Sequence, residues 1–381
     1  MRRPRVLIAY KSLPRYRVPF FEALRDRLAE DRVDLSLVYG QGTPREAARN
    51  DGARLEWAIS RHNKVLLVGG REVIWQPCLA EARSADLVIV EQASRLLLNY
   101  ALLGLQAAGH VNVAFWGHGA NLQARTANTP SERLKRRVSR LPHWWFAYTE
   151  GSKNRVTALG YPPERVTVVQ NAQDTEQLAD AVAAVSLRER DRFRAEHDLG
   201  EGPVGLFLGS LSRDKRLDFL LDAAARIAAD RPDFRLLVAG EGEERARVLA
   251  AAEAHHWIRY LGRVNGLQER ALVLAASDAL LMPGLVGLVA LDSFAAGVPL
   301  LTTAVDFHSP EIEYMQHDVN GVIAPDPGDP AAYAGFAIEL MTSEEKRPRL
   351  LEGCLEARRT FTLASMVDRF EDGVQAALAA P

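Results

Sequence analysis

Residues 282–303 form the segment that most constrains the fold of this chain. A short apolar strand ends at Met282 and is followed by a glycine-containing loop, a helical stretch with one acid (Asp292), a glycine stop at Gly297 and a second apolar strand. This order is typical of a strand–helix–strand unit with parallel strands. The amides of residues 284–288 would then lie at a helix N-terminus, where N–H donors and the helix dipole suit a phosphate. Asp292, about one turn further in, could accept hydrogen bonds from a ribose diol.

The same alternation of apolar strands and helical patterns runs through the whole chain in two series. The first series places strands at residues 5–10, 33–39, 64–68, 85–90, 111–115 and 144–148, and the second at 204–208, 234–239, 258–261, 279–282, 299–302 and 321–324. The apolar runs indicate strands that are buried on both faces, as in parallel sheets covered by helices. We therefore predict an α/β protein with two doubly wound parallel-sheet domains.

The length of 381 residues also favours two domains over one. We expect a first domain at 1–172, a linker region at 173–203 and a second domain at 204–362. The amphipathic helix at 363–381 is expected to pack back on the first domain. Ligands of such folds bind beyond the carboxyl ends of the strands, so we expect a central cleft between two facing sheets.

Composition excludes several classes of protein. A net charge of −2 gives no general attraction to nucleic acid, so we expect none as a partner. Two cysteines, Cys78 and Cys354, argue against a disulfide framework and favour a reducing compartment. No apolar run reaches membrane-spanning length, and the basic start of the chain leads directly into a strand. We expect a cytoplasmic protein.

Several short motifs follow one another in a defined order. They are Val168-Val-Gln-Asn-Ala-Gln-Asp174, Gly209-Ser-Leu with Lys215, Val238-Ala-Gly-Glu-Gly242, Leu261-Gly-Arg-Val264, Gly287-Leu-Val-Ala-Leu-Asp292 with Gly297-Val-Pro299, and Val319-Asn-Gly-Val322. In order and spacing they resemble the family 4 glycosyltransferases over nearly the full chain. The resemblance implies the GT-B fold, two Rossmann-like domains facing a cleft, and retaining transfer of a hexosyl group from a nucleotide-diphosphate sugar.

The resemblance also implies which residues hold the donor, for which a UDP-sugar is favoured. Lys215 matches the family's diphosphate-binding cation, and Gly287, Leu288 and Asp292 match its helix start and ribose acid. Arg263 is a candidate for contact with the base or a phosphate. No metal or other cofactor is expected.

Three departures from the family pattern bear on the donor site. Gly284 stands where the family has an acid that holds the donor sugar. Ser210 replaces an arginine, for which Arg213 is a plausible substitute. His308 and Ser309 lie where the family has a Gly-Gly pair, and we expect them to contact sugar hydroxyls.

Catalytic and acceptor residues are expected in the first domain. His118, after an apolar strand, matches the family histidine at the anomeric centre, and Glu91 ends a neighbouring strand where it could bind an acceptor or handle a proton. Tyr16 and Arg17 lie in a loop where an acceptor would enter. That acceptor would be a glycan, a lipid-linked sugar or a small molecule. Retention through attack on the same face, with the departing phosphate taking the proton, requires no pair of catalytic carboxylates.

Residues 131–145 bear on a further partner. They hold five basic residues and one acid, and end in two tryptophans, which suits loose contact with an anionic membrane leaflet. A solvated basic helix followed by a core strand is the alternative interpretation.

Other functions also remain open. A sugar-nucleotide 2-epimerase shares the fold, and a non-catalytic nucleotide-sugar-binding subunit would tolerate the missing acid at Gly284. A nicotinamide enzyme is disfavoured, because the segment that starts Gly240-Glu-Gly242 lacks the third glycine of the dinucleotide fingerprint.

Overall fold

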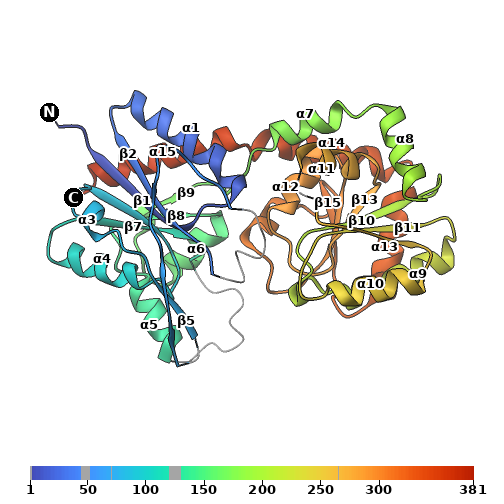
Figure 1. The fold of residues 1–381 in the computed structure, drawn as a ribbon, viewed down its shortest axis with the longest axis horizontal. Coiled ribbons are helices and arrows are strands. Elements are labelled where there is room, and N and C mark those ends of the chain that lie inside the picture. The colour runs from blue at the N-terminus through green and yellow to red at the C-terminus, as the bar shows by residue number, and fades with distance from the viewer. Residues whose placement is uncertain (1, 44–51, 70, 120–129, 265) are drawn as a thin grey trace. The chain divides into compact units, whose positions relative to one another are not determined.

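A computed structural model describes residues 2–43, 52–69, 71–119, 130–264 and 266–381. The chain divides into two compact units, which we call unit 1 (Met1–Gln173 and Leu363–Pro381) and unit 2 (Asp174–Thr362). Each unit has its own parallel sheet with helices packed against it (Figure 1).

The sheet of unit 1 has seven strands, and every neighbouring pair is parallel. In spatial order they are β3 (Ile59–Ser60), β2 (Asp34–Gly40), β1 (Arg5–Ser12), β6 (Leu87–Glu91), β7 (Asn112–Gly117), β8 (Trp144–Ala147) and β9 (Val166–Val168). The helices of unit 1 are η1 (Arg15–Arg17), α1 (Val18–Glu30), α3 (Leu79–Ala82), α4 (Leu97–Ala107), α5 (Pro130–Val138), α6 (Glu150–Ala158), η2 (Pro163–Arg165) and α15 (Leu363–Ala379). The strands β3 and β9 were not predicted, because runs of two and three residues are too short for a periodicity to show.

The C-terminal helix α15 packs in unit 1, against α1, β8 and β9. Its Phe370 stacks on Phe146 of β8 with 4.3 Å between ring centroids, and it also meets Phe20 and Trp116 edge-on. All four aromatic side chains are fully buried, so the apolar face of α15 completes the core of unit 1.

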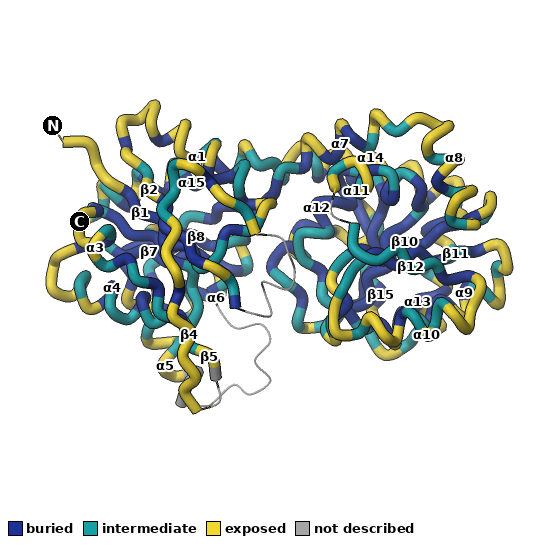
Figure 2. The backbone as a smooth tube through the Cα atoms, in the orientation of Figure 1, coloured by how far each residue is buried: buried dark blue, intermediate teal, exposed yellow. Residues whose placement is uncertain are grey.

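The sheet of unit 2 has six strands in the order β12 (Ile258–Gly262), β11 (Arg235–Ala239), β10 (Val204–Leu208), β13 (Ala279–Leu281), β14 (Leu300–Thr303) and β15 (Gly321–Ala324). All pairs are parallel, and β10, β11 and β13 to β15 are almost wholly buried, which gives the dark core in Figure 2. The helices are α7 (Glu176–Ala183), α8 (Leu187–Glu196), η3 (Arg213–Lys215), α9 (Leu217–Asp230), α10 (Arg245–Ala254), α11 (Leu267–Ala275), α12 (Val289–Ala296), η4 (Pro310–Tyr314), α13 (Pro330–Thr342) and α14 (Lys346–Thr360). Residues expected as a linker form α7 and α8, which pack on α11 within unit 2.

Both sheets reverse their strand order beside their first strand. In unit 1 the chain proceeds outward from β1 to β2 and β3 and then returns to β6 on the other side of β1. In unit 2 it proceeds from β10 to β11 and β12 and returns to β13. Loops that leave such a point at the carboxyl ends of the strands diverge and leave room for a ligand. The loops after β1, β6, β10 and β13 are therefore the places to examine for a site.

The predicted strand at 64–68 is present, but its predicted environment is wrong. It forms β4 (Lys64–Val68), which pairs antiparallel with β5 (Arg71–Trp75) in a separate two-stranded hairpin. All five residues of β4 are exposed, as the yellow tube in Figure 2 shows. The apolar run resembles a buried parallel strand in composition, but no other element of the described residues covers its side chains.

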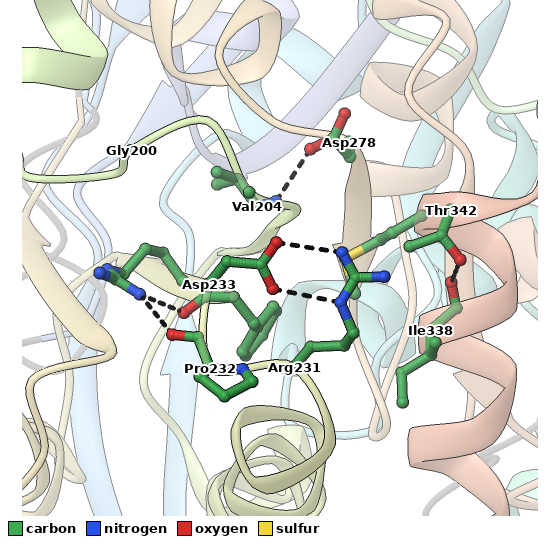
Figure 3. A network of polar contacts seen from close by, with 12 residues as sticks. Gly200, Val204, Arg231, Pro232, Asp233, Asp278, Ile338 and Thr342 are labelled. Carbon is green, nitrogen blue, oxygen red and sulfur yellow. Dashed lines mark hydrogen bonds and ion pairs between the residues drawn. The ribbon is translucent and has the colours of Figure 1, made fainter.

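Polar contacts fasten the amino end of the sheet in unit 2. Asp278 accepts a hydrogen bond from the amide of Val204 at 2.8 Å and pairs with Arg347 at 3.0 Å, so it ties the start of β13 to the start of β10 (Figure 3). Beside it, Arg231 donates two hydrogen bonds to Asp233 at 3.1 and 3.0 Å. The charges at this edge of the sheet are thus paired, Asp278 with Arg347 and Arg231 with Asp233.

Among the described residues, no helix is both long enough and apolar enough to span a bilayer.

Candidate functional site

The loops after β10 and β13 meet at the strand-order reversal of unit 2. The amide of Leu285 donates to the carbonyl of Asp214 at 2.8 Å, and the ammonium of Lys215 donates to the carbonyl of Leu285. Lys215 is only 9% exposed, and this burial lowers its pKa to about 8. A lysine of this kind is still mostly charged at pH 7, and an anion bound beside it would offset the cost of its burial. Lys215 and residues 284–288, predicted together as donor-binding, therefore lie together.

Gly284 has no room for a side chain. A Cβ atom built on it would lie 2.3 Å from the carbonyl oxygen of Asp214 and 2.7 Å from the Cα of Lys215. Because both are backbone atoms, the loops would have to move apart to admit any larger residue. The close approach of these two loops therefore excludes an acid at position 284.

His308 joins the loop after β14 to the loop after β13. Its Nδ1 accepts from the amide of Val286 at 3.1 Å, and its Nε2 lies 2.8 Å from the carbonyl of Thr303, to which it donates. Burial, and secondarily the charge of Lys215, lower the pKa of His308, so the ring is neutral and its tautomer is fixed by these contacts. With both ring nitrogens used, the predicted contact of His308 with sugar hydroxyls is corrected to a positioning role.

Ser309 occupies a more open position next to the start of α12. Its amide donates to the carbonyl of Val286 at 3.0 Å, and its hydroxyl lies 3.3 Å from a Cβ built on Gly287. The hydroxyl therefore faces the glycine that lies two residues before the start of α12. The buried carboxylate of Glu311 lies on this side of Gly287 as well, with an oxygen 3.9 Å from that Cβ position. The sequence showed Glu311 beside the altered Gly-Gly position, but we predicted no role for it.

Asp292 lies in the first turn of α12 and is 6% exposed. One of its carboxylate oxygens is 3.7 Å from a guanidinium nitrogen of Arg270 on α11. A ribose diol at this carboxylate would have to share it with Arg270. The ribose role of Asp292 stays a prediction.

Of the other predicted donor residues, Ser210 and Arg213 precede Lys215 in the loop after β10, and Arg263 lies in another loop of unit 2. Arg213 is on the surface, with its side chain 3.9 Å from a carboxylate oxygen of Glu244 and its amide 3.4 Å from Glu243, both after β11. Ser210 is exposed and its hydroxyl lies 3.3 Å from that of Ser212. The half-buried Arg263 follows β12. The donor-binding roles of these three residues stay predictions.

Arg216 is a residue that sequence reasoning missed. It adopts a left-handed backbone conformation at the start of α9, with a φ of 56°. Its guanidinium donates to the carbonyl of Pro283 at 3.3 Å and to the hydroxyl of Thr303 at 3.0 Å. It therefore ties the segment just after β13 to the end of β14. An arginine one residue after the matched lysine was the only sequence signal.

In unit 1, the loops after β1 and β6 meet at the corresponding reversal. A carboxylate oxygen of Glu91 accepts from the amide of Lys11 at 2.5 Å. A cavity of about 560 Å³ opens here, and its lining includes Glu91, Lys11, Tyr10, Tyr16 and His62. Tyr16, 39% exposed, and Glu91 thus line one cavity, as expected of residues that bind one ligand. Lys11, Tyr10 and His62 were not predicted, because only the fold brings β1 and the loop after β3 together.

His118 lies just beyond β7 in unit 1. Its ring meets Tyr148 edge-on at 4.7 Å, and its Nδ1 is buried without a hydrogen-bond partner among the described residues. Burial, together with the charge of Arg155, lowers the pKa of His118 to about 4. The neutral ring can accept a hydrogen bond from a hydroxyl but is a weak base at pH 7. Its catalytic role stays a prediction.

Arg17 is buried and bonded to other groups of the protein, so its predicted acceptor-binding role is corrected to a structural one. It is 1% exposed, and its guanidinium donates to the carbonyl of Ala172 at 3.1 Å and to the side chain of Asn171. The same group lies over the Trp116 ring at 5.1 Å. Residues 171 and 172, which are distant in the sequence, lie against Arg17 and exclude it from solvent, and the sequence alone could not show this.

The described residues contain no group of three or more His, Cys, Asp or Glu side chains arranged to hold a metal ion. The expectation that the protein needs no metal stays a prediction.

Part of the chain is similar in sequence to known proteins. Residues 202–343 match the family model described as glycosyl transferases group 1. D-inositol 3-phosphate glycosyltransferase of Thermobispora bispora is 30% identical over 225 residues, covering 55% of this chain and 50% of that protein. Phosphatidyl-myo-inositol mannosyltransferase of Mycobacterium leprae is 28% identical over 210 residues, covering 53% and 54%. The chain thus spans about half the length of the curated relatives it matches.

Solved structures match over nearly the whole chain. The Anabaena protein Alr3699/HepE in complex with UDP gives a TM-score of 0.72 at 14% identity and covers 97% of this chain and 99% of its own. Sucrose-phosphate synthase of Thermosynechococcus elongatus gives 0.71 at 14% identity and covers 100% of both chains. At this identity the likeness concerns the fold. The chain therefore has the GT-B fold of two Rossmann-like domains, and its residues 202–343 match the glycosyl transferases group 1 family model.

Proposed function

We propose that this protein is a retaining glycosyltransferase of family 4 that transfers a hexosyl group from a nucleotide-diphosphate sugar, with a UDP-sugar favoured. Unit 2 would bind the donor, and unit 1 would bind the acceptor in the cavity beside Glu91. Support for the donor class comes from the Anabaena neighbour, which binds UDP and UDP-glucose. The named activities of the partial relatives support sugar transfer.

One observation carries the proposal. A buried lysine, the start of a helix and a serine hydroxyl lie together at the strand-order reversal of unit 2. Departure of a nucleoside diphosphate builds negative charge on its oxygens, and fixed N–H donors with one cation stabilise that charge better than water does. Lys215 would supply the cation and the amides at residues 287 and 288 the fixed donors.

The acceptor side of the proposal uses a neutral histidine. With its pKa near 4, His118 is uncharged at pH 7 and can accept a hydrogen bond from an attacking hydroxyl. The proton would pass to the departing phosphate, since His118 is too weak a base to keep it. Glu91 and Tyr16 would orient the acceptor.

Gly284 favours a second candidate, a nucleotide-sugar-binding subunit without transfer activity. The backbone of residues 214 and 215 fills the space where a carboxylate would hold the donor sugar. Such a subunit would keep the diphosphate contacts of Lys215 and lack those needed for transfer.

A two-stage experiment separates these functions. Purified protein is first screened by thermal shift with UDP-, GDP- and dTDP-sugars, because a ligand that binds only the folded state raises the melting temperature. Nucleotide release and product formation are then measured with the stabilising donor and a panel of glycan, lipid-linked and small-molecule acceptors, with the anomeric configuration read by NMR.

Transfer with retained configuration is the expected result. Inverted product would refute retention, while donor binding without turnover across the panel would favour the binding subunit. A new sugar formed from donor alone would identify an epimerase. If no nucleotide sugar shifts the melting temperature, the proposal fails at its first step.

A further inference from the structure

The β4–β5 hairpin of unit 1 exposes a continuous apolar surface. Val65, Leu66, Leu67 and Val68 are 38%, 49%, 75% and 60% exposed. Since successive side chains on a strand point to opposite faces, both faces of β4 are apolar. A groove on a partner protein would contact the side chains on one face of β4. A lipid layer that the strand enters would contact the side chains on both faces. Exposed large hydrophobic side chains are concentrated here. Of the eleven in the described part of the chain, four lie on β4, one lies on α5 and one lies just after α5.

The base of the hairpin is firmly held. Ile74 of β5 is 1% exposed, and its amide donates to the carbonyl of Arg95 at 2.8 Å. Ile74 also forms a parallel bridge with Leu96, and β5 packs against α4. The apolar strand β4 is thereby attached to the loop that follows β6, although its own side chains remain exposed.

The basic helix α5 borders the same loop. Lys135, Val138 and Ser139 line a small hollow together with Ala93 and Ser94, which directly precede Arg95. Figures 1 and 2 show the hairpin and α5 at the same end of unit 1. The hairpin and the helix therefore flank a common segment.

The outer side of α5 combines positive charge with apolar side chains. Arg133, Arg136 and Arg137 are exposed on the helix and Arg140 just after it. Leu134 and Leu141, which are 53% and 49% exposed, lie among these arginines. A mixture of arginines and leucines next to an apolar ribbon matches the layers of an anionic bilayer, with headgroups outside and acyl chains beneath.

We propose that the β4–β5 hairpin and α5 form a docking surface for an anionic lipid bilayer. The side chains of β4 enter the boundary between headgroups and acyl chains, and the arginines of α5 contact lipid phosphates. This surface extends the basic segment considered from the sequence by an apolar element that the sequence alone placed in a core. It does not depend on the proposed sugar transfer, because lipid binding is measured without donor or acceptor.

The test uses the full chain and vesicles of phosphatidylcholine, with or without phosphatidylserine, in a sedimentation assay. The wild-type protein should bind the anionic vesicles and bind more weakly as salt is raised or phosphatidylserine is omitted. Replacing two leucines that enter the bilayer, in Leu66→Ser/Leu67→Ser, should weaken binding more than about tenfold. Arg133→Ser/Arg137→Ser should weaken binding to anionic vesicles and reduce its salt dependence.

A matched control replaces two exposed leucines of unit 2. Leu351 and Leu355 on α14 are 41% and 38% exposed, and Leu351→Ser/Leu355→Ser should bind vesicles as the wild type does. Thermal unfolding checks that each variant is folded. The single variant Leu67→Ser, which removes the most exposed of the four side chains, provides the test if the double variant does not fold.

Three results would overturn the proposal. The first is that the wild-type protein does not bind anionic vesicles. The second is that the hairpin variant binds them as tightly as the wild type does. The third is that the α14 control loses as much vesicle binding as the hairpin variant. If the wild type instead forms dimers that the hairpin variant abolishes, with no vesicle binding, the surface joins two copies of the chain and the lipid proposal is wrong.

Discussion

Lys215→Met should make the unliganded protein more stable while weakening its binding of UDP. Burial lowers the pKa of Lys215 from 10.5 to about 8, which corresponds to roughly 3 kcal/mol spent on keeping the ammonium charged below pH 8. Methionine removes that cost and retains an apolar chain of similar length. It also removes the hydrogen bond to the carbonyl of Leu285, worth about 1–2 kcal/mol. We therefore expect a net stabilisation of about 1–2 kcal/mol at pH 7.

The pH dependence has a definite sign. The folded-state pKa is below the unfolded one, so between pH 8 and 10.5 the unfolded chain holds a proton that the folded chain has released. The contribution of Lys215 to the unfolding free energy is therefore least favourable below pH 8 and improves as the pH rises to 10.5. The wild type should gain stability relative to Lys215→Met across this range, which urea unfolding at pH 7 and pH 10 measures.

UDP binding should change in the opposite direction. Loss of a charge-assisted contact to the diphosphate should weaken UDP binding by more than about 1.4 kcal/mol, or tenfold, in a titration by calorimetry at pH 7. The affinity of the wild type should also fall as the pH rises above about 8, because the ammonium loses its proton, and the variant should lack this fall.

A second buried lysine provides the control. Lys346, 8% exposed, pairs with Asp318 at 2.9 Å and with Glu339 at 3.3 Å. Lys346→Met should lower stability and leave UDP affinity unchanged. If Lys215→Met behaves like this control, less stable at pH 7 and unaltered in UDP affinity, then Lys215 is a structural lysine and the reasoning fails.

Three further substitutions test other parts of the account. Gly284→Ala should destabilise the protein by about 1–3 kcal/mol in urea unfolding, because its Cβ would collide with backbone atoms. The control Gly335→Ala, which has open space around its Cβ position, should not destabilise it. Equal stability of Gly284→Ala and the wild type would show that the loops move apart freely. Asp292→Asn should weaken UDP and UDP-sugar equally in calorimetry if it binds ribose, and an effect on the sugar nucleotide alone would contradict that role. Arg17→Met should cost about 2–4 kcal/mol in unfolding free energy and leave UDP affinity unchanged, because its partners lie within unit 1; unchanged stability would return Arg17 to the acceptor site.

The sequence predicts most of the fold because buried parallel strands are long apolar runs separated by helical patterns. It misleads at Lys64–Val68, where the same apolar composition lies on an exposed hairpin. The Gly69-Gly70 pair between two apolar runs was a hairpin signal that we did not use. Composition indicates that a strand is apolar but not what covers it.

The candidate site is predictable where loop order determines it and unpredictable where side-chain contacts do. Lys215 was predicted from the family resemblance and Gly287 from the helix start after a strand, and the loops that carry them lie together because they follow neighbouring strands of one sheet. The positioning role of His308 depends on two backbone groups that only the folded loops bring to its ring. Arg17 is buried by Asn171 and Ala172, more than 150 residues away, and no local pattern could reveal this.

The central claim is that the strand-order reversal of unit 2 holds the diphosphate of a nucleotide sugar. A crystal structure of the protein with UDP tests this most directly. The account predicts diphosphate oxygens within hydrogen-bonding distance, about 3 Å, of the Lys215 ammonium and of the amides at residues 287 and 288. UDP bound elsewhere, with Lys215 still donating only to Leu285, would contradict it.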